Sequence, residues 1–390
     1  MFDRIRSLVD RYFKPSPPLP AGVYTYKAPA DAPFPYRLHL RIENDGDGIL
    51  ILNASTVLHL NQTAVEYAYH LIQGHSTDET AATLARRYRV SREQAANDFN
   101  DFTSRLTTLI DTPDLDPITY LDFERVDVHA VNLTAPLRMD CALTYAIAEK
   151  TDLQAAPVER VRRELSTEEW QAVLEKAWQA GIPHVIFTGG EPTLRPDLIE
   201  LIAHAESLGM VTGILTNGHR FAEPKFLADV LLSGLDHLMI VLDENEDLCW
   251  EAIRDTLASD LFVTVHLTVH KKNQPQIPTL LRTLANYKVK ALSLSTESAE
   301  MAAALKEIRE LAAALEMTLI WDLPVPYSKS NPVATELESE GEYYDGAGNA
   351  WIYVEPDGDV LAAQGKPTAL GNLLINDWKT IWTAAKSRSE

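Results

Sequence analysis

The stretch HVIFTGGEPTLRPDLIELIAHAESLGMVTGILTNG, residues 184–218, decides the fold. Two apolar runs, 184–188 and 211–216, flank a segment with helical periodicity, 197–208, that stops at Gly209. A strand, a helix and a second strand in this order predict parallel strands joined by a right-handed crossover. Gly189 and Gly190 follow the first strand, and their lack of side chains lets the backbone approach a ligand closely.

The same alternation extends from about 128 to 323. We expect strands at 131–134, 184–188, 211–216, 236–242, 261–269, 289–296 and 317–322. Helices are expected between them at 167–180, 197–208, 224–233, 247–258, 276–286 and 299–315. This pattern predicts an α/β fold, a partial (β/α)6 TIM-like barrel over 128–330.

The N-terminal third has a different pattern. Residues 1–13 have helical spacing, and the proline-rich segment 15–34 predicts an extended linker, so that 1–35 precede the first domain. Two strands, 36–43 and 49–60, surround a turn at 44–48, and helices are expected at 63–73, 77–88 and 92–110. The order of these elements predicts a winged-helix-like α+β domain at 36–113.

A linker at 114–127 and a C-terminal extension at 331–390 complete the predicted organisation. In the extension, residues 356–359 (PDGD) predict a β-hairpin turn, and 371–382 has a helical pattern.

The net charge of the chain limits the classes of molecule that it can bind. The chain has 390 residues with 35 Lys and Arg against 56 Asp and Glu, a formal net charge of −21. Because phosphate binding needs clustered cations, this balance argues against nucleic acid as the main partner. No apolar run reaches the length of about 20 residues that crosses a bilayer, and the N-terminus lacks a secretory signal pattern. We therefore expect a cytoplasmic protein without a transmembrane segment.

The chain has two cysteines, Cys141 and Cys249. They are too few for a disulfide framework or a cysteine-rich zinc site. They are also too few for a cubane iron–sulfur cluster, which takes three or four thiolates.

In a βα barrel, ligands bind at the carboxyl ends of the strands. The segment Gly-Gly-Glu-Pro at 189–192, the pair Asn217-Gly218 and Asp243 are predicted at these ends and make up a candidate site. Gly-Gly-Glu-Pro and Asn-Gly are equally common as plain turns without a ligand. His266, Thr268 and His270 share one strand face; polar lining of the barrel interior is favoured over a metal site. Cys249 is expected to pack inside a helix.

Residues 184–218, together with GLDHLMIVLD and VHLTVHKKN further along, closely resemble the radical SAM superfamily. In that family the Gly-Gly-Glu-Pro segment binds the methionyl amino group of S-adenosylmethionine, and an iron–sulfur cluster supplies the electron that cleaves it. The resemblance implies a cofactor site made up of Gly189, Gly190, Glu191, Pro192, Asn217, Asp243 and Arg138. In this site we expect Arg138 to pair with the carboxylate of the cofactor in place of iron.

The flanking regions carry two further resemblances. Residues 36–113 are similar to PqqD-like domains, which bind leader peptides of ribosomally made, modified peptides. The segments GAGNAWIYVEPDGDV and LGNLLINDWKTIW are similar to a SPASM-type extension.

The chain departs from the family where the cluster would bind. The family's loop is Cys-x3-Cys-x2-Cys; aligned through Thr134 and Tyr145, its three positions are Leu137, Cys141 and Thr144. Cysteines expected near Asp345 and Ala363 of the extension are also absent. We therefore expect no iron–sulfur cluster, no metal ligands and no catalytic residues for radical chemistry, with weak S-adenosylmethionine binding at most.

These observations predict a cluster-free radical SAM homologue, a pseudoenzyme, that binds a precursor peptide through 36–113 by strand addition and works with a catalytically complete partner. Two alternatives stay open for an active enzyme. One uses S-adenosylmethionine without iron, with Glu191, Asp243 and His270 as acid–base groups, and the other completes its cluster with ligands from a partner. A structural assembly subunit is a further alternative.

Overall fold

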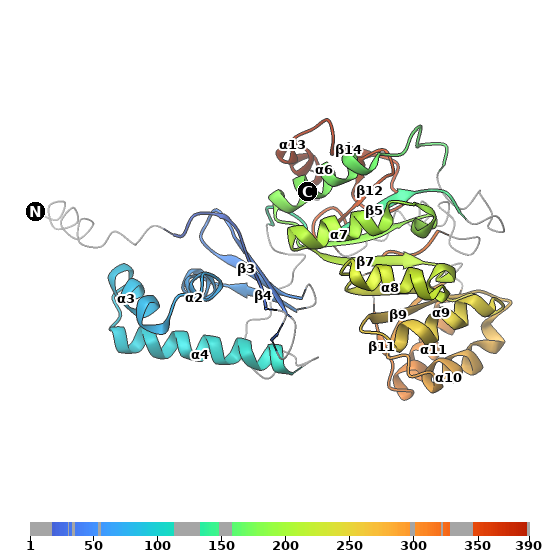
Figure 1. Cartoon of the computed structure of the whole chain (residues 1–390), viewed down its shortest axis with the longest axis horizontal. Helices are drawn as coiled ribbons and strands as arrows, with labels where there is room; N and C mark the ends of the chain where they lie inside the picture. The colour runs from blue at the N-terminus through green and yellow to red at the C-terminus, as the bar shows by residue number, and fades with distance from the viewer. Residues whose placement is uncertain are drawn as a thin grey trace, which may run out of the picture. The chain divides into compact units, whose positions relative to one another are not determined.

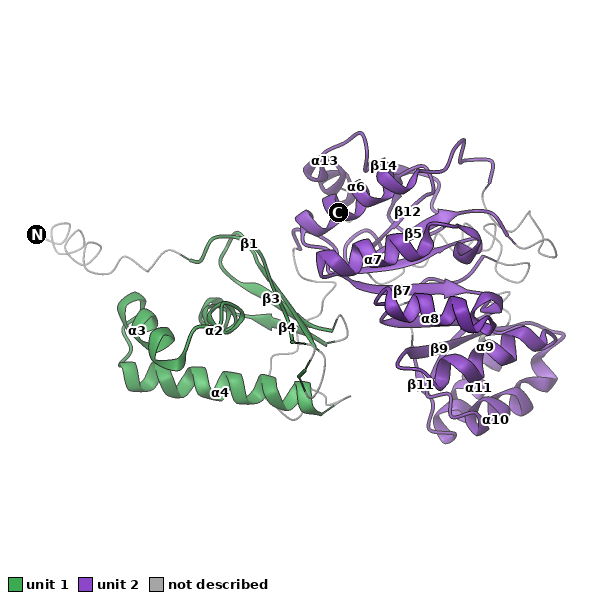
Figure 2. Cartoon of the chain, viewed as in Figure 1, with its two compact units in different colours: residues 1–131 green, residues 132–390 purple. Residues whose placement is uncertain are grey.

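The computed structural model describes residues 18–29, 31–32, 36–53, 56–112, 133–147, 158–296, 301–320, 323–327 and 346–387. The chain divides into two compact units, residues 1–131 and 132–390 (Figure 2). The helix predicted at 1–13 and the linker predicted at 114–127 lie outside the described residues.

The first unit has a four-stranded antiparallel sheet in the order β1-β2-β3-β4. Its strands are β1 (Gly22–Lys27), β2 (Arg37–Ile42), β3 (Gly48–Leu52) and β4 (Thr56–Leu60). The prediction of an extended linker is wrong for β1, because its pairing with β2 is a contact that no local pattern reveals. The single strand predicted at 49–60 is two strands, since Asn53 adopts a left-handed turn conformation with φ 50°.

Three helices of the first unit confirm the predicted pattern: α2 (Gln62–Ile72), α3 (Thr77–Arg87) and α4 (Arg92–Asp111). Ser76 and Glu79 form a capping box that begins α3, and Ser91 caps α4. Figure 1 shows α4 as the longest of the three, running beneath α2 and α3. The helices bury one face of the sheet in a core that includes Leu38, Leu40, Leu50, Leu58, Val65, Phe102 and Leu106.

The second unit is built on a ten-stranded sheet in the order β11-β10-β9-β8-β7-β6-β5-β12-β13-β14 (Figure 1). Seven consecutive parallel strands form its main part. They are β5 (Arg138–Thr144), β6 (His184–Gly189), β7 (Val211–Thr216), β8 (His237–Val241), β9 (Phe262–Val269), β10 (Ala291–Thr296) and β11 (Thr318–Leu319).

Six helices connect these strands and confirm the six βα units of the predicted partial barrel. Ser166 and Glu169 form a capping box at the start of α6, and Gly181 ends the helix in the left-handed conformation. The helices are α6 (Thr167–Ala180), α7 (Leu198–Leu208), α8 (Pro224–Leu232), α9 (Asp247–Leu257), α10 (Ile277–Asn286) and α11 (Ala302–Ala314).

The first barrel strand is where the sequence prediction was wrong. The described strand is 138–144, a segment for which no element was predicted, whereas the strand was expected at 131–134, of which residues 131 and 132 lie outside the described residues. Arg138 and Asp140 make the segment look like a loop, yet both are buried and pair with each other at 2.8 Å. Arg138 also lies over the ring of Trp351, 5.3 Å from its centroid.

The C-terminal extension is part of the same sheet. It contains β12 (Trp351–Val354), β13 (Asp359–Leu361), β14 (Ala369–Asn372) and α13 (Trp378–Lys386). The predicted hairpin at 356–359 is confirmed, whereas the helix predicted at 371–382 begins only after the cap at Asp377. β12 pairs in parallel with β5, so the extension is hydrogen-bonded directly to the first barrel strand. Within the described part of the chain, every helix is too short or too polar to cross a membrane.

Candidate functional site

The two glycines after β6 close tightly onto the end of β5. The Gly190 amide donates to the Thr144 carbonyl oxygen at 2.7 Å, and the Glu191 amide donates to that of Ala146 at 2.8 Å. A Cβ at Gly189 would lie 2.3 Å from the Thr144 oxygen, and one at Gly190 would lie 2.2 Å from the Ala146 oxygen. Glycine is therefore required here by the neighbouring backbone, before any ligand is considered.

Glu191 is a buried carboxylate, 4% exposed, that accepts four hydrogen bonds from the chain itself. Its Oε1 accepts from the amide (3.0 Å) and hydroxyl (2.6 Å) of Thr193 and from the hydroxyl of Thr216 (2.7 Å). Its Oε2 accepts from the Asn217 amide at 2.8 Å. Glu191 thus binds the end of β6 to the end of β7.

The other predicted residues at this edge lie close by. Pro192 begins a 3-10 turn, Pro192–Leu194, in which Pro192 and Thr193 are buried and Leu194 is exposed. The side chain of Asn217 accepts a hydrogen bond from the His219 amide at 3.0 Å. Asp243 is exposed just past β8, the neighbour of β7, and accepts from the Asn245 amide at 3.0 Å. The turn Gly189–Pro192 thus shares the carboxyl edge of the sheet with Asn217 and Asp243.

Arg138 does not belong to this group. It is the first residue of β5 and pairs in register with His184, whereas Thr144 at the other end of β5 pairs with Gly189. Six residue steps of about 3.3 Å place it about 20 Å from the glycines along the strand. The proposal that Arg138 receives a cofactor carboxylate there is wrong, because it assumed that β5 ended before residue 138.

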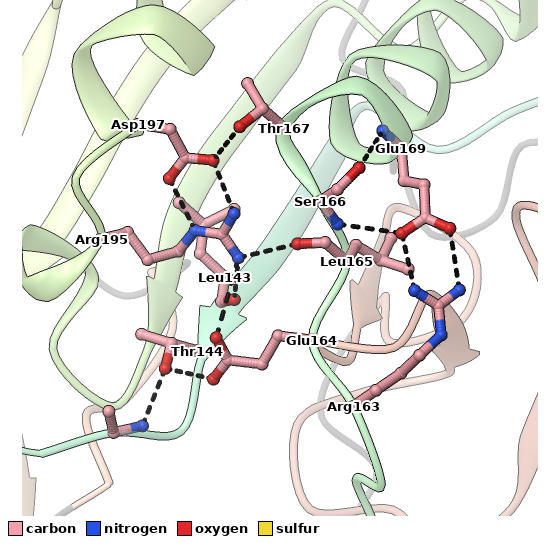
Figure 3. A network of polar contacts seen from close by, with 11 residues as sticks. Leu143, Thr144, Arg163, Glu164, Leu165, Ser166, Thr167, Glu169, Arg195 and Asp197 are labelled. Atoms are coloured by element: carbon pink, nitrogen blue, oxygen red, sulfur yellow. Dashed lines mark hydrogen bonds and ion pairs between the residues drawn. The ribbon is translucent and has the colours of Figure 1, made fainter.

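Sequence reasoning missed an arginine that supports the same edge (Figure 3). Arg195 donates to both oxygens of Asp197, at 2.9 and 2.6 Å. Its remaining terminal nitrogen donates to the carbonyl oxygens of Leu143 and Leu165, each at 3.1 Å, and lies 3.8 Å from Glu164. Arg195 therefore joins the turn after β6 to the end of β5 and to the start of α6. Its place in the segment Arg-Pro-Asp just before a helix is the signal that marks it.

A second missed cluster joins the end of β5 to the extension. The Tyr145 hydroxyl donates to Glu355 at 3.0 Å and lies 3.3 Å from the Tyr353 hydroxyl. Arg160 donates to the same Glu355 oxygen at 2.7 Å. Burial raises the pKa of Glu355 and that of Tyr145. These residues lie up to 210 positions apart in the sequence, so no local sequence pattern predicts their contact.

Of the three polar residues predicted to share a face of this strand, His266 and Thr268 lie together, with His266 Nε2 3.3 Å from the Thr268 hydroxyl, whereas His270 lies past β9 and accepts from the Asn273 amide. His266 is fully buried; its Nδ1 lies 3.0 Å from the Ser293 hydroxyl and its Nε2 lies 3.0 Å from the Ser295 hydroxyl. Burial lowers the pKa of His266 to about 3, so that the ring is neutral. Among the described residues, no group of three or more His, Cys, Asp or Glu side chains is arranged to hold a metal ion.

The thiols do not fit a cubane cluster. Cys141 is buried in the middle of β5, and Cys249 is buried in α9, where it donates to the Val241 carbonyl as expected for helix packing. Burial raises the pKa of Cys141 far above its ordinary value and that of Cys249 to about 11, which disfavours the thiolate that binds iron.

The three positions assigned to the cluster loop also fall elsewhere. Leu137 precedes β5, Cys141 is inside it and Thr144 is its last residue. The chain past β5 starts at Tyr145 and contains no cysteine before Cys249. In the extension, Ala363 is buried after β13, and Asp345 lies outside the described residues.

Comparison with known families assigns both units. Residues 141–285 match the radical SAM superfamily, and residues 48–109 match the coenzyme PQQ synthesis protein D (PqqD) family. The chain carries a radical SAM domain and a PqqD domain. The radical SAM match covers the barrel from β5 to α10, and the PqqD match covers β3 to α4 of the first unit.

Curated relatives of the two-domain chain are PqqA peptide cyclases. That of Gluconobacter oxydans is 34% identical over 159 residues, 37% of this chain and 44% of that protein. That of Bradyrhizobium diazoefficiens is 29% identical over 38% of this chain and 43% of that protein. That of Streptomyces rochei is 27% identical over 65% of this chain and 77% of that protein. The chain thus spans less than half of the first two relatives.

Solved structures with the same fold come from Streptococcus suis. SuiB bound to the precursor peptide SuiA superposes with a TM-score of 0.60 at 15% identity, over 88% of this chain and 86% of that one. SuiB bound to S-adenosylmethionine superposes with a TM-score of 0.58 at the same identity and coverage. At this identity the likeness establishes the fold alone.

Proposed function

We propose that this chain is a cluster-free radical SAM homologue that binds a precursor peptide through its PqqD domain and presents it to a catalytically complete partner enzyme. The positions of the two cysteine side chains, Cys141 and Cys249, are the observation that supports the proposal. Both cysteines are buried, one within β5 and one within α9, and the turn after β6 satisfies its polar groups from the chain itself. A thiolate-ligated cluster at the carboxyl edge has no ligands from this chain.

Peptide binding is supported by β4, an edge strand of the first sheet, which pairs only with β3 among the described residues. The Asn53 amide donates to β2 at Arg37, so odd-numbered residues of β3 face β2 and even-numbered ones face β4. Leu50 pairs with Leu58, and the backbone groups of Val57 and His59 therefore point away from β3. They offer an incoming extended peptide its hydrogen bonds at the edge formed by β4.

The comparisons favour the same kind of partner. PqqA peptide cyclases are named for a peptide substrate, and SuiB was solved with its precursor peptide. A chain that has a PqqD domain and a barrel without cluster ligands is suited to hold a peptide while another chain performs the chemistry.

The test separates binding from chemistry. Peptides encoded beside the gene are labelled and titrated with the full chain by anisotropy, and anaerobically purified protein is analysed for iron and sulfide. Binding that disappears when residues 36–113 are deleted, together with iron below stoichiometry, supports the proposal. Stoichiometric iron and sulfide with formation of 5′-deoxyadenosine would overturn it.

A further inference from the structure

The first sheet has a second edge strand, β1, at the side opposite β4 (Figure 2). Among the described residues β1 pairs only with β2, in six consecutive residue pairs from Gly22 to Lys27. Native edge strands are commonly protected from pairing with another chain by prolines, bulges or charged side chains. β1, with the sequence GVYTYK, has one charged residue, Lys27, at its end. The centre of the strand therefore lacks this protection.

The backbone of β1 alternates between its partner β2 and the outside of the sheet. The Ala28 amide, just past the end of β1, donates to the Tyr36 carbonyl oxygen at 2.8 Å, so even-numbered residues of β1 exchange hydrogen bonds with β2. The backbone groups of Val23 and Thr25 therefore point away from β2. Thr25 is exposed, so its outward backbone groups can be reached by another strand.

The order of side chains around Thr25 is symmetric, because Tyr24 and Tyr26 flank it. In an antiparallel pairing of two β1 strands centred on Thr25, each Thr25 faces the other, and each Tyr24 faces Tyr26 of the second copy. Threonine pairs and aromatic pairs that lie directly opposite each other stabilise antiparallel sheets. Val23 then faces Lys27 of the second copy, so no like charges oppose each other. The strand is therefore complementary to itself.

Both tyrosines are held in place by rings of their own chain. Tyr24 packs edge-on against Tyr69 of α2 with 5.0 Å between the ring centroids, and Tyr26 lies 5.7 Å from Tyr36. Tyr24 and Tyr26 are partly buried against the core of the first unit, so each ring keeps some exposed surface. Rings that are already ordered lose little side-chain entropy when a second strand arrives, which lowers the cost of association.

We propose that β1 is a homodimer interface, at which a second copy of this chain adds its own β1 in antiparallel orientation around Thr25. The pairing joins two four-stranded sheets into one sheet of eight strands, and β4 remains the outer strand on both sides. The edge proposed for peptide binding stays open in both copies, and the dimer does not depend on that function. Because a six-residue edge gives a small interface, the dimer is reversible and depends on concentration.

Sedimentation velocity of the full chain over a range of concentrations measures the dimer, after circular dichroism has established that the variants are folded. We expect the average mass of the native chain to rise toward twice that of the monomer. Thr25→Pro removes an outward N–H and no bond of the β1–β2 ladder, and should weaken the dimer about tenfold or more. Thr25→Val keeps the N–H and should dimerise within about threefold of the native chain. A native chain that stays monomeric at every concentration overturns the proposal, as does undiminished dimerisation of Thr25→Pro.

A disulfide cross-link tests the register and does not depend on whether the strand tolerates proline. The chain's two cysteines, Cys141 and Cys249, are buried, so Thr25→Cys adds the one exposed thiol. The Cα atoms of a hydrogen-bonded antiparallel pair lie about 5.5 Å apart, within reach of a disulfide. Mild oxidation should link Thr25→Cys into a dimer, whereas Thr107→Cys, exposed on α4, should stay monomeric.

Two outcomes of the cross-linking experiment would overturn the proposal. Equal cross-linking of Thr25→Cys and Thr107→Cys would reflect random collision rather than a β1 interface. Loss of the Thr25→Cys cross-link when the gene-encoded peptide is added would assign β1 to the peptide instead of to a second copy. A cross-linked dimer that still binds this peptide supports both the dimer and the peptide site on β4, whereas a cross-linked dimer without peptide binding supports the dimer and counts against the proposed function alone.

Discussion

Tyr145 and Glu355, 210 residues apart, are joined by a hydrogen bond of 3.0 Å at the end of the first barrel strand. Arg160 donates to the same carboxylate at 2.7 Å. Tyr145 and Arg160 lie on either side of residues 146–159, the segment that follows β5. One carboxylate of the C-terminal extension therefore contacts both residues that flank this segment.

Removing one partner of this buried pair should destabilise the second unit. In Arg160→Met the carboxylate of Glu355, 4% exposed, loses its charged donor but stays buried. We expect the free energy of unfolding to fall by about 1.5–3 kcal/mol, as for other hydrogen bonds to buried charges. Urea denaturation followed by tryptophan fluorescence measures the change.

Arg163→Met is the matched control. Arg163 also pairs with a glutamate, Glu169, at 2.7 Å, but its side chain is 56% exposed. Solvent screens such a pair, and we expect the free energy of unfolding to fall clearly less than in Arg160→Met. Equal losses in the two variants would contradict the role given to Glu355.

Glu191 provides a second test, because its two oxygens face different backbone amides. Oε1 accepts from the Thr193 amide and Oε2 from the Asn217 amide, and neither amide can become an acceptor. In Glu191→Gln the new NH2 group must therefore face an N–H donor. We expect a loss of about 1–3 kcal/mol in unfolding free energy, with or without S-adenosylmethionine present.

The comparison variant is Glu251→Gln, at an exposed site of α9 where the nearest cation, Arg254, is 3.8 Å away. We expect it to change stability by less than about 0.5 kcal/mol. If Glu191→Gln were as stable as the native chain and only abolished S-adenosylmethionine binding, Glu191 would be a ligand-binding residue rather than the link between β6 and β7.

Sequence patterns predicted the elements that are defined locally. The helices expected at 77–88 and 167–180 are real helices, α3 and α6, and the apolar runs of β6 and β7 mark real strands. The Gly-Gly-Glu-Pro turn was located for the same reason, because glycine after a strand is a local signal.

What the sequence could not predict depends on distant partners. β5 contains Arg138 and Asp140, which are typical of a loop until Trp351 and their mutual ion pair are known. β1 becomes a strand only by pairing with β2. Misplacing β5 moved Arg138 to the wrong end of the sheet, which shows how one strand boundary controls the composition of a candidate site.

Acid should weaken the second unit through a histidine pair. The Nε2 atoms of His184 and His237 lie 2.7 Å apart, and a Cβ at Gly213 would lie 2.1 Å from the His237 ring. Burial, with help from the Arg138 charge, lowers the pKa of His237 to about 4. Burial, followed by the charges of His237 and Arg138, lowers the pKa of His184 well below its ordinary value. The unfolded chain takes up protons near pH 6.5, and the folded chain resists them.

Lowering the pH therefore destabilises the folded second unit. Between about pH 6.5 and pH 4 the unfolded state binds more protons, so the unfolding free energy falls as pH falls, by up to about 1.4 kcal/mol per pH unit for each histidine. His237→Asn should reduce the difference in unfolding free energy between pH 7 and pH 5. A pH dependence unaffected by His237→Asn would show that this pair is not its source.

The edge of β4 gives the most direct test of peptide binding. The backbone N–H of His59 points away from β3, so His59→Pro removes an outward donor without removing a bond of the β3–β4 ladder. We expect the affinity for the gene-encoded peptide to fall about tenfold or more by anisotropy. His59→Thr changes the side chain and keeps the N–H, and it should bind within about threefold of the native chain. If both substitutions weakened binding equally, the side chain of His59 would be the contact; if neither did, the peptide would bind elsewhere than on β4.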